Sequence, residues 1–195
     1  VDAACFSESD QIHKFAQELI AGGDPFLNYR HHNGSARVVM EQELGLRHIA
    51  GTSVRLIMND RADLCVVAGF DGCHVGQDDL SVEAVRGIIG NDRIVGLSTH
   101  NTEQVKQADE SSADYVAVGP VFWTASKAIP DPVVGLEGLR RARVLTRKPL
   151  VAIGGITRAN CRQILEAGPD SAAVIGDLLR EPKKAIEDFL SLFNK

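Results

Sequence analysis

Short apolar runs alternate with amphipathic stretches along the whole chain. The apolar runs are rich in β-branched residues and end in polar residues or glycine, a pattern that predicts β-strands. The predicted strands are Pro25–Tyr29, Val54–Met58, Gly72–His74, Arg93–Leu97, Tyr115–Val118, Leu150–Ile153 and Ala172–Ile175. Between them, apolar residues recur at helical spacing. The predicted helices lie near residues 9–22, 35–50, 61–69, 81–89, 101–112, 135–146, 157–167 and 181–193.

The alternation of strands and helices predicts the fold class. A strand every ~20–25 residues, followed by a helix, implies parallel βαβ units. Most of the strands are apolar on both faces, as expected when helices cover the sheet. A further strand just before residue 1 or at Val1–Ala4 would complete eight units. We therefore predict an α/β fold, a (βα)8 TIM barrel whose first strand is truncated or short, as one domain over residues 1–195.

An open doubly wound sheet is the alternative architecture. No Gly-x-Gly-x-x-Gly follows the first strand, which makes this alternative weaker.

Composition excludes several function classes. A net charge of −5 gives no electrostatic footprint for nucleic acid or acidic membranes, and 5% aromatic residues leave little for base stacking. No apolar run approaches the ~18 residues of a membrane helix, no signal peptide is visible, and the four cysteines lack Cys-x-x-Cys spacing. These features predict a cytoplasmic location.

Carboxylates follow two neighbouring strands of the predicted barrel. Barrel enzymes carry their chemistry at the carboxyl ends of the strands. Asn59 and Asp60 follow one strand, and Asp78 and Asp79 follow the next. Each pair could simply cap the helix after it. Because two adjacent strands end this way, we predict that Asp60 and Asp79 bind Mg²⁺, with Asp78 facing solvent.

Two other segments have the features of phosphate sites. Gly154 and Gly155 follow a strand, and the turn at Ile175 and Gly176 follows the next one. Loops after the last two strands of a barrel commonly bind phosphate through backbone amides. A tight turn that merely needs glycine is the alternative.

The longest predicted loop, 119–134, carries Lys127, which is either a surface charge or a phosphate-binding cation beside Thr124 and Ser126.

Taken together, these segments resemble thiamine-phosphate synthases over nearly the whole chain. Each segment alone is a weak signal, but their order and spacing are highly specific. The matching segments are NYR at 28–30, IMNDR at 57–61, DGCHVGQDD at 71–79, GLSTHN at 96–101, ADYVAVGPVFWTASK at 113–127, GLEGL at 135–139 and VAIGGIT at 151–157. The resemblance implies a (βα)8 barrel that joins hydroxymethylpyrimidine diphosphate to hydroxyethylthiazole phosphate. The products would be thiamine phosphate and pyrophosphate, and Mg²⁺ would be required.

The resemblance also implies roles for individual residues. It implies that Asp60 and Asp79 bind the metal, that Asn59 orients the diphosphate and that Ser98 contacts the pyrimidine. The implied catalytic residues are Arg30, Asn59, Ser98 and Lys127. The implied substrate-binding residues are Asn28, Arg30, His32, Asn59, Ser98, Thr124, Ser126, Lys127, Gly155, Ile175 and Gly176.

The sequence departs from the family pattern at several positions. Asn28 replaces a longer glutamine, and His32 replaces a lysine and is mostly neutral near pH 7. Gly176 stands where the family has serine, and Ser126 where it has threonine. The first two changes alter the diphosphate site and lower the activity expected there.

Three other functions stay open on the sequence. One is a thiazole tautomerase-like enzyme, which needs an acid–base histidine such as His74 or His100. Another is a non-catalytic paralogue that binds thiamine precursors, which Asn28 and His32 would favour. The third is a phosphate-binding isomerase, although no convincing acid–base pair is visible. Whichever holds, we expect small-molecule substrates, no nucleic acid and no membrane partner, and the sequence leaves a homo-oligomer open.

Overall fold

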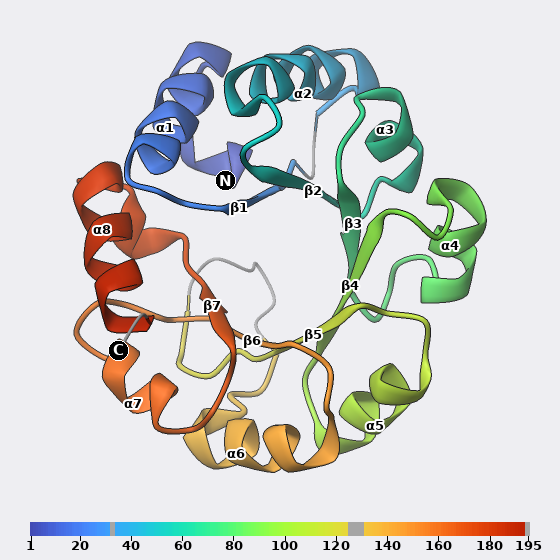
Figure 1. The fold of residues 1–195 in the computed structure, drawn as a ribbon, viewed down its shortest axis with the longest axis vertical. Coiled ribbons are helices and arrows are strands. Elements are labelled where there is room, and N and C mark those ends of the chain that lie inside the picture. The colour runs from blue at the N-terminus through green and yellow to red at the C-terminus, as the bar shows by residue number, and fades with distance from the viewer. Residues whose placement is uncertain (32–33, 125–130, 194–195) are drawn as a thin grey trace.

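Seven parallel strands form a single sheet that curves around the centre of the molecule (Figure 1). This computed structural model describes residues 1–31, 34–124 and 131–193. The strands pair in the order of the sequence, each with the next. They are β1 (Phe26–Tyr29), β2 (Arg55–Asn59), β3 (Gly72–Val75), β4 (Ile94–Thr99), β5 (Tyr115–Val118), β6 (Leu150–Ile153) and β7 (Ser171–Ala173).

Helices lie outside the strands around the whole ring (Figure 1). They are α1 (Ser9–Ala21), α2 (Ala36–Ala50), α3 (Ala62–Val67), α4 (Val82–Ile89), α5 (Thr102–Glu110), α6 (Gly135–Leu145), α7 (Cys161–Leu165) and α8 (Pro182–Phe193), with short 3₁₀ turns η1 (Ala3–Cys5) and η2 (Gly176–Leu178). Side-chain caps fix the start of three helices, because Ser35, Ser81 and Asn101 each accept a hydrogen bond from the first turn of α2, α4 and α5.

The seven predicted strands are confirmed, but β2 and β4 continue further than predicted, into polar residues. β2 includes Asn59, which pairs with His74, and β4 includes Thr99, which pairs with Val118. The prediction ended both strands where polar residues begin. Neighbouring backbones keep pairing past that point, because ladder hydrogen bonds do not depend on side-chain polarity.

Two predictions of local structure were wrong. Val1–Ala4 does not form a strand, because residues from Ala3 onward turn into η1, and only an isolated parallel bridge joins Asp2 to Arg30. The predicted helix at 157–167 is reduced to α7, because Thr157–Asn160 form a turn in which the Asn160 side chain accepts from the Thr157 amide at 2.8 Å. The described residues therefore show an α/β fold of seven parallel strands that resembles a TIM barrel.

The main core lies between the strands and the surrounding helices. Leu56, Val95 and Leu150 on the strands are fully buried, as are Leu139 and Ile164 on the helices. Burial of the strands on both sides explains their nearly continuous apolar sequence. None of the described helices has both the length and the apolar character needed to cross a membrane.

Candidate functional site

The carboxyl ends of β2 and β3 bring the predicted acidic residues together. Asp60 shares a side-chain hydrogen bond with Asp79 and a second one with Asn59. The Asp60 amide donates to the carbonyl of His74 on β3 at 2.8 Å, which holds the two strand ends side by side. Asp79 is fixed from its own loop, because its Oδ2 accepts from the amide of Gly76 at 2.8 Å. The predicted pairing of these two strand ends is therefore present in the structure.

Asp60 is held in an unfavourable state in two respects. Burial, together with the hydrogen bond and the charge of Asp79, raises the pKa of Asp60 to about 7, against the lowering effects of Asn59 and Arg30. Its φ is +64°, and it is the only non-glycine residue with positive φ in the described ranges. Such backbone strain is concentrated at functional sites. A cation bound beside Asp60 would favour its charged form, which burial and the neighbouring Asp79 disfavour.

The donor set fits a magnesium ion. Carboxylate oxygens are ligands that Mg²⁺ prefers, and Mg²⁺ usually keeps water and phosphate oxygens in the rest of its shell. Within residues 1–31, 34–124 and 131–193, no third Asp, Glu, His or Cys completes a metal-binding cluster. Two carboxylates with open surroundings suit a metal that is shared with a phosphorylated substrate. Asp78 is exposed, as predicted.

Arg30 lies just beyond β1 and forms a salt bridge with Asp2 at 2.9 Å. Asp2 is buried and also accepts from the amide of Ala4 at 3.1 Å, so its carboxylate has a fixed position. Arg30 acts electrostatically on Asp60, which places its positive charge near the acidic pair. Asn28, on β1, has a buried Oδ1 without a hydrogen-bond partner in the described part of the chain. Asp2 is a residue of this region that the sequence analysis missed.

Ser98 lies on β4 and is held by two neighbours. Its Oγ is 2.8 Å from Nε2 of His74, and its carbonyl accepts from the Gln77 side chain at 2.7 Å. The other nitrogen of His74, Nδ1, lies 2.8 Å from the hydroxyl of Tyr115. Burial lowers the pKa of His74 to about 4, so this ring is neutral at pH 7.

The histidines needed by a tautomerase are both engaged in the fold. His74 is bonded at both ring nitrogens. His100 lies 2.6 Å from the carbonyl of Gly119 through Nδ1, which must donate because a carbonyl only accepts. Its Nε2 lies 3.6 Å from Asp131. These contacts give both histidines fixed positions in the fold.

Gly154 and Gly155 are required by close packing. Both have positive φ, +89° and +67°. A Cβ on Gly155 would lie 2.6 Å from the carbonyl oxygen of Trp123, and one on Gly154 would lie 2.5 Å from Cβ of Pro120. The alternative of a turn that needs glycine is therefore supported, whereas phosphate binding stays a prediction. No helix begins directly at this turn, because α7 begins only at Cys161 and is five residues long.

The turn after β7 lies next to charged groups. Gly176 is exposed and opens η2, directly after Ile175. Asp177 accepts from the backbone amide and from Nε of Arg158 at 2.8 and 3.0 Å, which ties this turn to the segment after β6. The two predicted phosphate segments are thus linked through this ion pair.

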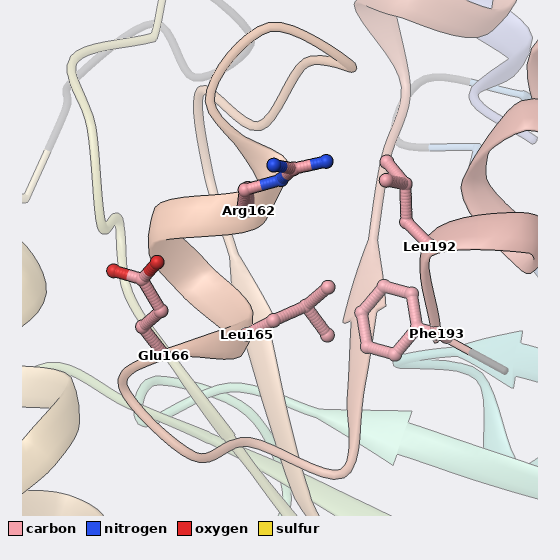
Figure 2. A pocket seen from close by; sticks show the side chains of 5 residues that line it. All are labelled: Arg162, Leu165, Glu166, Leu192 and Phe193. Atoms are coloured by element: carbon pink, nitrogen blue, oxygen red, sulfur yellow. The ribbon is translucent and has the colours of Figure 1, made fainter. Parts of the chain in front are cut away.

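Four predicted residues belong to the remaining loops. Thr124 is partly buried at the end of a described segment, and Trp123 before it is 73% exposed. His32, Ser126 and Lys127 lie outside the described residues. A hollow of about 530 Å³ lies away from the strand ends. Figure 2 shows it between α7 and α8, lined by Arg162, Leu165, Glu166, Leu192 and Phe193.

Comparison with known proteins gives a consistent result. Residues 2–178 match the family model described as thiamine monophosphate synthase. A thiamine-phosphate synthase of Koribacter versatilis is 51% identical, over 100% of this chain and 93% of that protein, and one of Chloroflexus aurantiacus is 42% identical over 82% and 74%. The solved thiamine phosphate pyrophosphorylase of Pyrococcus furiosus superposes with a TM-score of 0.86 at 30% identity, over 93% of this chain and 89% of that one. The resemblance inferred from the sequence motifs is confirmed, and the chain belongs to the thiamine-phosphate synthase family.

Proposed function

We propose that this enzyme joins hydroxymethylpyrimidine diphosphate to hydroxyethylthiazole phosphate and releases pyrophosphate. The observation that carries the proposal is the pair Asp60 and Asp79, which share a hydrogen bond beside Asn59 at the ends of two adjacent strands. In a chain of this family, a site for a divalent cation at this rim suits a substrate that carries a diphosphate.

The chemistry requires charge stabilisation rather than a protein nucleophile. The carbon–oxygen bond to the diphosphate breaks, its electrons leave with pyrophosphate, and the thiazole nitrogen then forms the new bond to the pyrimidine methylene carbon. The protein has to hold the two rings in line and stabilise the negative charge that develops on the leaving group. We assign Arg30 the task of binding the diphosphate, because its guanidinium acts electrostatically on Asp60 and is held by a salt bridge to Asp2. We assign the same task to Lys127.

Asp60 and Asp79 would hold Mg²⁺, which supplies positive charge to the departing pyrophosphate. Asn59 lies beside them with an amide that can donate to diphosphate oxygens. Ser98 would contact the pyrimidine. Asn28, whose buried Oδ1 has no partner among the described residues, together with His32 would complete the pyrimidine diphosphate side.

The second substrate would bind through its phosphate to backbone amides at Gly155, Ile175 and Gly176. We include Thr124 and Ser126 as hydroxyl donors to phosphate oxygens. The absence of a serine side chain at 176 has little effect if backbone N–H groups are the donors there.

The test is Mg²⁺-dependent formation of thiamine phosphate from the two substrates. Asp60→Asn keeps the shape of the side chain and tolerates the left-handed backbone, but it removes the negative charge. We expect turnover to fall by at least 100-fold, at unchanged secondary structure measured by circular dichroism. Asp78→Asn removes a neighbouring exposed charge and should leave turnover within twofold of the wild type. Equal turnover in both variants would contradict the metal site.

We further propose that the chain is one domain whose sheet closes into a (βα)8 barrel through the N-terminal segment. Arg30 donates its amide to the carbonyl of Val1, and Ala3 donates to the carbonyl of Arg30, both at 2.9 Å, as in a parallel strand pair. Closure predicts slow amide hydrogen exchange in Ser171–Ala173 and in this segment, and fast exchange in both would contradict it.

A further inference from the structure

Three side chains from three strands form a continuous hydrogen-bonded row inside the sheet. Tyr115 on β5 contacts Nδ1 of His74 on β3, and Nε2 of His74 contacts Oγ of Ser98 on β4, each at 2.8 Å. The aromatic rings of Tyr115 and His74 also stack, with centroids 5.4 Å apart and an interplanar angle of 24°. The two side chains are almost fully buried, at 9% and 8% exposure of their residues. Water therefore does not compete for these bonds.

Gly96 makes this row possible. Strand register places His74, Gly96 and Tyr115 side by side on β3, β4 and β5. A Cβ on Gly96 would lie 2.1 Å from Cζ of Tyr115, so any other residue would occupy the space that the phenol ring uses. The missing side chain lets the tyrosine cross its neighbouring strand and reach the histidine on the next one. A glycine inside a strand is otherwise unfavourable, which indicates a specific reason for it here.

The available donors and acceptors determine which group donates in each hydrogen bond of the row. A neutral histidine ring has one N–H group, on either Nδ1 or Nε2, whereas a protonated ring donates from both nitrogens and would leave the hydroxyl hydrogen of Tyr115 without an acceptor. If the hydrogen were on Nδ1, it would donate to Tyr115, and the buried hydroxyl hydrogen of Tyr115 would lack an acceptor. The hydroxyl group of Tyr115 forms no other hydrogen bond with the described part of the chain. An unsatisfied buried donor costs about 1–3 kcal/mol, so this tautomer is disfavoured.

The other tautomer uses every hydrogen. The hydroxyl of Tyr115 donates to Nδ1, and the hydrogen on Nε2 donates to Oγ of Ser98. The hydroxyl hydrogen of Ser98 is then not required by His74 and can be donated to a bound molecule. Since Ser98 forms no other side-chain hydrogen bond within the described residues, its hydroxyl group keeps this freedom.

We propose that Tyr115 and His74 are positioning residues that fix Ser98 as a hydrogen-bond donor, so that the site selects a substrate ring with an acceptor nitrogen. The proposal rests on the proposed function, in which Ser98 contacts the pyrimidine. A pyrimidine nitrogen with a lone pair accepts from this hydroxyl group, whereas a C–H or N–H group at the same place leaves the donor unsatisfied. A site built this way rejects an analogue that lacks the acceptor.

The first test examines the wild-type protein without substrate. Nitrogen-15 NMR distinguishes the two neutral tautomers of a histidine, and the His74 signals are assigned by their loss in His74→Gln. We expect hydrogen on Nε2 and none on Nδ1 at pH 7. Hydrogen on Nδ1 would overturn the proposal, whether or not the protein makes thiamine phosphate. Turnover by the wild type tests the proposed function separately.

The second test is a double-mutant cycle in turnover. Tyr115→Phe keeps the ring stacked but removes the hydroxyl group, and we expect kcat/KM for the pyrimidine diphosphate to fall about tenfold, with KM for the thiazole phosphate unchanged. In a Ser98→Ala background the same change should have no further effect, because Tyr115 acts through Ser98. Equal losses in both backgrounds would overturn the proposal. So would unchanged kinetics in Ser98→Ala alone.

Tyr29→Phe is the matched control. This tyrosine is also buried, and its hydroxyl donates to Gln42 on α2 instead of to His74. It should leave kcat/KM within twofold and the His74 tautomer unchanged. A tenfold loss in this control as well would mean that loss of any buried tyrosine hydroxyl lowers activity, and the positioning role would be rejected.

Discussion

Glu43 on α2 gives a prediction that depends only on the fold. Its side chain is fully buried, at 0% exposure, and both carboxylate oxygens have no hydrogen-bond partner in the described residues. Burial raises the pKa of Glu43 from 4.5 to about 7, although the positive charge of Arg61 lowers it in part. A group whose pKa is raised on folding stays protonated in the native state after the unfolded chain has released its proton. The free energy of unfolding therefore decreases as the pH rises from 4.5 to 7.

The size of the effect follows from the shift. The shift from 4.5 to about 7 corresponds to a destabilisation of about 0.8 kcal/mol at pH 5 and about 3 kcal/mol at pH 8. Glu43→Gln removes the ionisation and keeps the shape. We expect the variant to be more stable than the wild type at pH 8 by about 2.5 kcal/mol more than at pH 5. Any cost of burying the amide is the same at both pH values and cancels in this comparison.

The assay is urea unfolding at pH 5 and pH 8, followed by far-ultraviolet circular dichroism. Glu41→Gln is the control, because Glu41 is on the same helix but is exposed, where it pairs with Arg37. The difference in free energy of unfolding between this control and the wild type should change by less than about 0.5 kcal/mol between the two pH values. If the free energies of unfolding of Glu43→Gln and the wild type differ by the same amount at both pH values, the native carboxyl group ionises normally and the reasoning is refuted.

Three further predictions concern the sheet and the residues around Asp60. Gly96→Ala places a methyl group in the space occupied by the Tyr115 ring, so we expect the free energy of unfolding in urea to fall by about 1–3 kcal/mol. Gly87→Ala, where a Cβ meets open space, should be neutral or stabilising. Asp60→Ala should be less stable than Asp60→Asn by about 1 kcal/mol without metal, because asparagine tolerates positive φ and alanine does not; equal thermal midpoints would contradict this. Asp2→Asn weakens the salt bridge that orients Arg30, and steady-state kinetics should show KM for the diphosphate substrate raised about tenfold.

Much of the fold could be predicted from the sequence because the strands are buried on both sides. Their apolar runs stand out against amphipathic helices, and a strand such as β5 was placed correctly to the residue. The polar ends of β2 and β3 were visible for the same reason, since Asn59 and Asp60 interrupt an apolar run. Adjacent parallel strands end at one rim, so the proximity of Asp60 and Asp79 followed from topology alone.

The interior row could not be predicted in the same way. Tyr115 is an ordinary strand residue in the sequence, and its contact with His74 crosses an intervening strand. The available signal was Gly96, which sits inside an apolar strand where glycine usually marks a close approach. Asp2 was missed because it precedes the first predicted element, and its function depends on the bridge to Arg30. The buried Glu43 follows the helical pattern of charged residues, and its burial depends on how α2 packs.

The strand order also has a consequence for how the chain folds. Each strand pairs with the strand that follows it in sequence, so every pair is joined through one helical connection. Paired residues such as Leu27 and Leu56, or Val116 and Leu150, are separated by comparable lengths of chain. The entropy of closing such loops varies with the logarithm of their length, so the closing costs differ by only about 0.7 kcal/mol between the short separation of Ile57 and Gly72 and the long separation of Val116 and Leu150. No strand pair is then strongly favoured as the folding nucleus by loop length, and side-chain packing decides which βα units form first.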